Sequence, residues 1–157
     1  MAFLAEAAIG YGRKAVSKAV ASASSRADTG HAMQVAARLD HLLLLLLLTG
    51  LNRPNISSRT VKKLDGFAKR LRLARTFGLI DDVTYNDLKT INEVRALFAH
   101  AERPVRFTSV PVRIKARGFH EWQPRASVRR LFDEAAARAD ATITGRISHL
   151  LYENTIA

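Results

Sequence analysis

Two charged side chains stand at apolar positions of expected helices, where a charge is costly unless it has a partner. At about 100° per residue, Arg95 falls within the apolar arc of a helix expected over 82–100, and Asp40 falls within that of a helix expected over 31–49. We therefore expect Arg95 and Asp40 to pair with each other. In the alternative, the aliphatic part of the Arg95 side chain packs on the helix while its guanidinium reaches solvent, and Asp40 caps a helix or is solvated.

His100 is the second candidate for chemistry, because imidazole is the side chain best suited to proton transfer near neutral pH. It follows Arg95 by five residues, which places it about 140° further round the helix. The two side chains can converge only at the end of the helix or across a pair of subunits. Glu93 lies on the face of His100 and is expected to orient it. The alternative for His100 is a C-terminal helix cap.

The charge of the chain points to a polyanionic partner. The 157 residues contain 25 Lys and Arg against 14 Asp and Glu, a net charge of +11. Residues 59–75 hold seven basic side chains against one acidic, and residues 102–130 hold eight against two. This balance favours nucleic acid, with contacts expected from four side chains of the first segment: Lys62, Lys69, Arg70 and Arg72. The alternative is a solvated basic face with no ligand.

Several classes of protein are disfavoured by the composition. There is no cysteine, and no two of the five histidines are four residues apart, so we expect no metal and no cofactor. The run Leu42–Leu48 is far shorter than the roughly 20 apolar residues of a membrane span, so it predicts a helix buried on all sides. We expect a cytoplasmic protein without a membrane partner.

The periodicity of apolar residues predicts an all-α, up-and-down helical bundle. Residues 1–30 are expected to form a basic amphipathic helix over 2–24 and a Ser- and Ala-rich linker over 21–30, and residues 31–157 the bundle. Gly50 and Gly78 are expected to end two helices, and the last helix is expected over 126–152. The segment 104–118, with alternating valine and arginine, is expected to be extended.

A resemblance to a known family rests on the sequence from Phe67 to His100. It contains a Phe-x-x-Arg helix, Leu-Ala, Gly-Leu-Ile, Asp-Leu and finally Val-Arg-Ala-Leu-Phe-Ala-His. This order resembles the mannitol-operon repressor family over about residues 31–115. That family is similar to the HEPN superfamily of helical bundles (higher eukaryotes and prokaryotes nucleotide-binding), which shares an Arg-x(4–6)-His motif, here Arg95 to His100.

The resemblance implies a HEPN-like homodimer that acts in regulation or defence, with RNA as its substrate. In active members the motif forms a metal-independent endoribonuclease. Carried over, Arg95 would hold the scissile phosphate and His100 would act as general base or acid. Ala96 departs from the polar residue usual after the arginine. The resemblance therefore leaves open a non-catalytic transcriptional regulator or a module that binds another protein.

Overall fold

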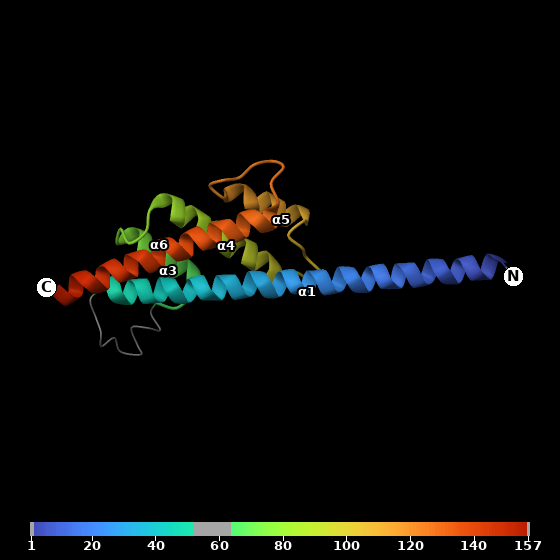
Figure 1. Cartoon of the computed structure of the whole chain (residues 1–157), viewed down its shortest axis with the longest axis horizontal. Coiled ribbons are helices and arrows are strands. Elements are labelled where there is room, and N and C mark those ends of the chain that lie inside the picture. The colour runs from blue at the N-terminus through green and yellow to red at the C-terminus, as the bar shows by residue number, and fades with distance from the viewer. Residues whose placement is uncertain (1, 52–63, 157) are drawn as a thin grey trace.

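A computed structural model describes residues 2–51 and 64–156, with side chains from Ser17 onward except Lys18. These residues form only helices and their connections, which confirms the predicted all-α bundle. The elements, labelled in Figure 1, are α1 (Ala2–Gly50), α3 (Phe67–Thr76), α4 (Asp82–Ala99), α5 (Val110–Lys115), the short 3-10 helix η1 (Ala116–Gly118) and α6 (Val128–Ile156).

The first helix is longer than predicted. α1 is one continuous helix through 21–30, so the prediction of a linker there is wrong. Ser25, within this stretch, already contacts the bundle, since its hydroxyl donates to the Val105 carbonyl at 2.8 Å, earlier than the expected boundary at residue 31. Serine and Gly30 lower helix propensity only modestly, and these contacts outweigh that cost. The N-terminal part of α1 extends past the other helices (Figure 1).

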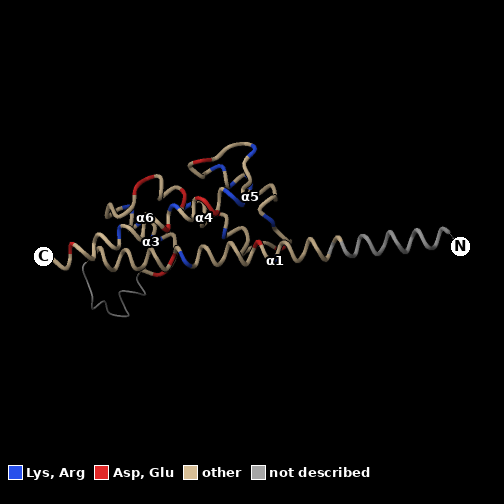
Figure 2. The backbone as a smooth tube through the Cα atoms, viewed as in Figure 1, with Lys and Arg blue, Asp and Glu red and all other residues tan. Residues whose placement is uncertain are grey.

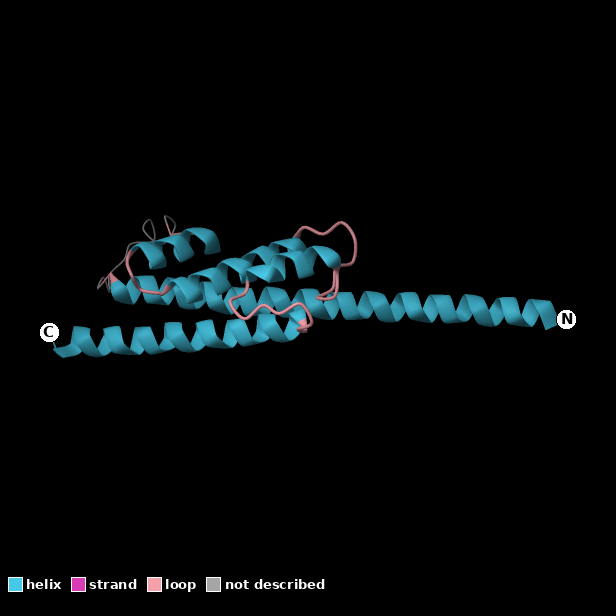
Figure 3. Cartoon of the chain, turned by 90° about the horizontal axis from the view of Figure 1, so that it is seen from above, coloured by secondary structure: helices cyan, strands magenta, loops and turns pink. Residues whose placement is uncertain are grey.

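α1 and α6 run side by side in the same direction. Their contacts keep a nearly constant separation in sequence, with His31 beside Asp133, Arg38 beside Asp140 and Thr49 beside Asn154. Figure 3 shows the two helices extending along the same axis. α4 runs the opposite way, because its start lies near the end of α1 and Arg95 near its end lies beside the middle of α1. α4 therefore runs antiparallel to both α1 and α6.

The leucine run packs into the core through one side only. Leu43, Leu46 and Leu47 are fully buried, whereas Leu45 is 38% exposed. The prediction that this helix is buried on all sides is therefore wrong. The segment Ala19–Gly50 is long and apolar enough to cross a bilayer by length and composition, and 33% of its most apolar window is buried. Since core helices of soluble proteins pass the same test, the cytoplasmic location stays a prediction.

The ends of α3 and α4 follow the predicted capping residues. Gly78 adopts φ +63° after α3, and the amide of Leu79 donates to the Ala74 carbonyl at 2.9 Å, which closes the helix with a Schellman turn. The Asp81 carboxylate accepts a hydrogen bond from the Thr84 amide at 2.7 Å and caps α4. These two caps fix the tight α3–α4 turn.

The connection between α4 and α6 is not extended as predicted. It contains α5 and η1, which pack on α4 through Val112, Ala116 and Phe119. Pro111 stands in the first turn of α5, where its missing amide hydrogen costs nothing and its fixed φ favours a helix. Of the alternating apolar residues in α5, only Val112 is buried, while Val110 and Ile114 are 69% and 55% exposed, so the alternation does not mark a buried strand face.

Candidate functional site

Asp40 is paired, but not with the arginine that the sequence suggested. Arg70 Nη1 donates to Asp40 Oδ2 at 2.5 Å, and Arg70 Nε donates to the Leu64 carbonyl at 2.8 Å. The predicted pair of Arg95 with Asp40 is therefore wrong. Arg70 had been expected to contact nucleic acid, yet its side chain is only 10% exposed and is held inside the bundle.

Arg95 and Asp40 nonetheless line one cavity of about 260 Å³ between α1, the start of α3 and α4. The remaining walls are Met33, Ala36, Ala37, Gly66 and Phe67. Two polar atoms of this cavity are buried without a hydrogen-bond partner, Asp40 Oδ1 and Arg95 Nε. Within residues 64–156 and the described part of α1, Arg95 makes no ion pair. Both atoms are enclosed by the surrounding side chains, so it is other atoms of Asp40 and Arg95 that line the cavity.

The sequence contains a signal that would have found Arg70. It follows Phe67 by three residues and precedes Ala74 by four, so all three lie on the same buried face of α3. A helical wheel places Asp40, Arg70 and Arg95 on core faces, as it does Asp87 of α4, but it does not show which of these charges meet. Which two charges pair depends on the offset between neighbouring helices along their axes.

His100 lies at the end of α4 and is exposed. Its backbone amide donates to the Ala96 carbonyl at 3.1 Å, so the residue is the C-cap of the helix. Its imidazole has no partner among the described side chains. Glu93, expected to orient the imidazole, instead pairs with Lys115 of α5 at 3.1 Å. His100 and Arg95 remain separate within one chain, as their spacing on the helix predicts.

Among the residues whose side chains are described, more exposed arginines lie around α5 than along α3. Among the four residues expected to bind nucleic acid, Lys69 and Arg72 are exposed, Arg70 is buried, and Lys62 lies outside the described residues. Five arginines between α4 and α6 are exposed and have no acidic partner in the described part of the chain: Arg103, Arg106, Arg113, Arg117 and Arg125. Figure 2 shows basic residues along this segment. We call these five arginines the α5 basic surface.

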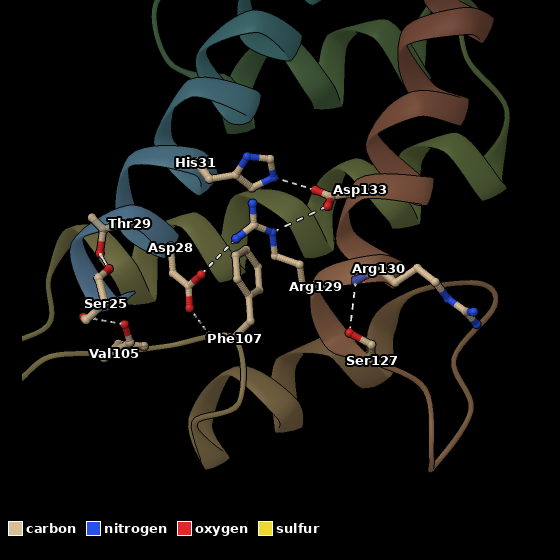
Figure 4. Close-up of polar contacts among 10 residues, drawn as sticks. All are labelled: Ser25, Asp28, Thr29, His31, Val105, Phe107, Ser127, Arg129, Arg130 and Asp133. Atoms are coloured by element: carbon tan, nitrogen blue, oxygen red, sulfur yellow. Dashed lines mark hydrogen bonds and ion pairs between the residues drawn. The ribbon is translucent and has the colours of Figure 1, made fainter. Parts of the chain in front are cut away.

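A second polar cluster, not found from the sequence, joins α1 to α6. Arg129 Nη1 donates to Asp28 at 3.0 Å, and His31 Nε2 lies 2.5 Å from Asp133 (Figure 4). Asp28 also accepts from the amide of Phe107 at 3.2 Å. These contacts connect residues about 100 positions apart, which sequence spacing alone does not reveal. Each charged group has a partner, so the cluster acts as a structural connection.

Asp87 is, with Arg70, one of the two charged residues that are buried in the described part of the chain, and the sequence analysis did not identify it as buried. It is 2% exposed and accepts from Arg138 Nη2 and from the backbone amide of His120, both at 2.9 Å. The pair joins α4 to α6 and holds the chain that follows η1. No group of three or more potential metal ligands occurs in the described residues.

Comparison with protein-family models, curated proteins and solved structures finds no match for this chain. The resemblance to mannitol-operon repressors and HEPN proteins, the dimer and the partners therefore remain predictions.

Proposed function

We propose that this protein binds RNA as a HEPN-type regulator or defence protein, with Arg95 contacting the phosphate backbone. One observation supports the proposal above the others: Arg95 lines a cavity and has no acidic partner among the described side chains, while Arg70 neutralises the neighbouring Asp40. The carboxylate is already paired, so the second arginine leaves an excess positive charge. A guanidinium in this state favours a phosphate, which it can bind through two hydrogen bonds.

The α5 basic surface adds the longer-range attraction that RNA binding requires. Its arginines begin just after His100 and lie on the connection packed against α4. Exposed cations attract the backbone of any nucleic acid irrespective of its sequence. RNA that follows this surface would reach the end of α4, where His100 is exposed.

Cleavage is the second part of the proposal. His100 would remove the proton from a ribose 2′-hydroxyl, whose oxygen then attacks the adjacent phosphorus while the bond to the 5′-oxygen breaks. The leaving oxygen takes up a proton, and the products are a cyclic phosphate and a 5′-hydroxyl. Arg95 would stabilise the charge on the phosphoryl oxygens. Since Arg95 and His100 do not share a face, we propose a homodimer in which one copy supplies each group.

The alternative function is a non-catalytic transcriptional regulator or protein-interaction module. It is supported by exposed apolar residues at the end of α6, where Leu151, Tyr152 and Ile156 are 54%, 67% and 68% exposed. Ala96 also supports it, because a methyl group cannot donate a hydrogen bond to substrate.

The test is incubation of mixed RNA in EDTA with the wild type, Arg95→Gln and His100→Ala. We expect cyclic-phosphate products from the wild type, a loss of at least about 100-fold with either variant, and normal thermal unfolding of both. Arg26→Gln, which removes an exposed arginine of α1 that does not line the cavity, is the matched control and should cleave normally.

Each other result has a defined meaning. RNA binding that depends on Arg95, without cleavage by any variant, would reject catalysis and retain the RNA-binding function. Absence of RNA binding at low salt would reject the whole proposal. Unfolding of Arg95→Gln would show that Arg95 stabilises the bundle, as Arg70 does, and would favour the non-catalytic alternative.

A further inference from the structure

Another cavity, of about 300 Å³, lies between the connection that follows η1 and the first turns of α6. Trp122, the one tryptophan of the chain, lines it together with Gln123, Ala126 and Leu131. Trp122 is half-buried and packs partly against the core, and Leu131 belongs to the core. The cavity thus offers an aromatic side chain and two aliphatic ones, held in place by the bundle, beside the exposed Gln123.

The carboxylates that line this cavity are already paired. Glu134 Oε1 lies 3.5 Å from Arg130 Nε, and Glu121 Oε2 lies 3.1 Å from Arg138 Nη1. A phosphate inside the cavity would face both carboxylates and would compete with them for Arg130, so it is disfavoured there. A neutral group would break no ion pair. The cavity therefore suits an uncharged group, and a flat ring is the shape that packs best on an aromatic side chain.

Arginines of the α5 basic surface border this neutral cavity. Arg125 directly precedes Ala126, and Arg117 precedes His120 by three residues, where Ala126 and His120 both line the cavity. Ala126 also lines a neighbouring cavity that contains Arg113. A neutral space beside cations matches a nucleotide within RNA, which has a neutral base and a negative phosphate.

We propose that this cavity holds one unpaired base of single-stranded RNA, stacked on Trp122, while Arg125 and Arg113 bind phosphates beside it. Stacking on an aromatic side chain accepts any base, so no base preference follows. An aromatic side chain of a partner protein would fill the cavity but would leave these arginines without anions. The inference rests on the proposed RNA-binding function and deepens it, because unpaired bases are free to stack on protein whereas those of a duplex are not.

The first experiment uses Trp122 as a reporter of its own site. Tryptophan emission of the full chain comes from Trp122 alone. At low salt, single-stranded oligo(U) should quench this emission. The duplex of oligo(A) with oligo(U), of the same length, should bind through its phosphates, as measured by anisotropy of labelled RNA, without quenching. UMP carries the same base but lacks the neighbouring phosphates, so it should quench only at concentrations at least about 100-fold higher than oligo(U).

The second experiment measures the same RNAs by anisotropy with variants of Trp122. Trp122→Ala should weaken binding of oligo(U) at least about fivefold and leave binding of the duplex unchanged. Trp122→Phe keeps a ring and should bind oligo(U) more tightly than Trp122→Ala does. Tyr85→Ala is the matched control, because Tyr85 is also a half-buried aromatic residue packed against the core but does not line this cavity. It should bind both RNAs as the wild type does.

Thermal unfolding establishes that each variant is folded, and quenching of the wild type decides the matter if Trp122→Ala is not. Binding of oligo(U) without quenching, or with equal affinity for folded Trp122→Ala, would overturn the base-stacking cavity and leave the proposed function intact. Quenching by UMP at the concentrations needed for oligo(U) would assign the cavity to free nucleotides and overturn the inference about RNA. Absence of binding by either RNA at low salt would reject both the cavity and the proposed function.

Discussion

Asp40, Arg70 and Arg95 show how much the position of a charged residue on its helix reveals about the residue it pairs with. Asp40, Arg70 and Arg95 each interrupt an apolar stripe, and a helical wheel detects all three. It does not detect that Asp40 meets Arg70 rather than Arg95. The physical reason is that a wheel gives the angle of a side chain about its helix but not its height relative to the next helix. The sequence analysis placed Asp40 and Arg95 together and assigned Arg70 to nucleic-acid binding, so it identified two of these residues and not the pair that forms.

The cap of α4 allows a pH-dependent prediction at one carboxylate. Hydrogen bonds from Thr84 hold the pKa of Asp81 below its ordinary value of 3.8. Because the folded state has the lower pKa, the cap contributes fully above pH 3.8 and its contribution is lost as the pH falls through the folded-state value. Asp81→Ala should lower the free energy of unfolding at pH 7 by about 1 kcal/mol, measured by urea denaturation. The loss should shrink below pH 3.8.

Asp81→Asn is the control, because asparagine caps a helix about as well but does not titrate in this range. It should retain stability at pH 7 and lose less stability than the wild type below pH 3.8. Equal stability of Asp81→Ala and the wild type at pH 7 would contradict the capping role.

At the scale of elements, prediction succeeded where local chemistry decides and failed where tertiary contacts decide. Gly50, Gly78 and Asp81 mark helix ends in the structure as in the sequence. The helix through 21–30 and the turn of α5 were missed, because both are stabilised by packing against segments distant in sequence. Alternation over three or four residues is too short to identify a strand, and in α5 it leaves Val112 buried and Ile114 exposed on opposite sides of the helix.

The close packing of η1 on α4 predicts that alanine destabilises the protein at Gly118, with Gly145 of α6 as the comparison. A Cβ at Gly118 would lie 2.5 Å from Thr90 Oγ1, whereas a Cβ at Gly145 of α6 meets nothing within 4 Å. Gly118→Ala should destabilise the protein by about 1–3 kcal/mol through this overlap. Gly145→Ala should stabilise it by about 0.5–1 kcal/mol, since alanine restricts the unfolded chain and favours helix. Thermal unfolding of the two variants compares them directly, and a neutral Gly118→Ala would contradict the close packing of η1.

Across the whole molecule, the basic side chains behind the net charge of +11 differ in whether they are paired with carboxylates. Much of the basic side-chain content of α3 and α6 is paired with carboxylates, including Arg70, Arg75, Arg129 and Arg138, whereas the α5 basic surface is unpaired in the described part of the chain. Net charge alone predicts a polyanion but does not locate its surface, because pairing across helices is set by the fold.

Salt dependence of RNA binding measures how many of these arginines contact phosphates. For single-stranded RNA, each phosphate contact should contribute about 0.7 to the slope of log affinity against log salt. Arg113→Gln and Arg117→Gln should each reduce that slope by about 0.7. Arg38→Gln, which removes an exposed arginine paired with Asp140, is the control. An unchanged slope in both variants of α5 would exclude this surface from the RNA interface.

The parallel contact of α1 with α6 has a consequence for synthesis of the chain. Asp133 and Asp140 follow their α1 partners by 102 residues, so at about 5–20 residues per second α1 waits roughly 5–20 seconds on the ribosome for the helix that covers it. During that interval Leu43, Leu46 and Leu47, which are fully buried in the finished protein, have only the earlier helices to pack against. The nascent chain thus presents an unusually leucine-rich, incompletely covered helix to chaperones and to other copies of itself.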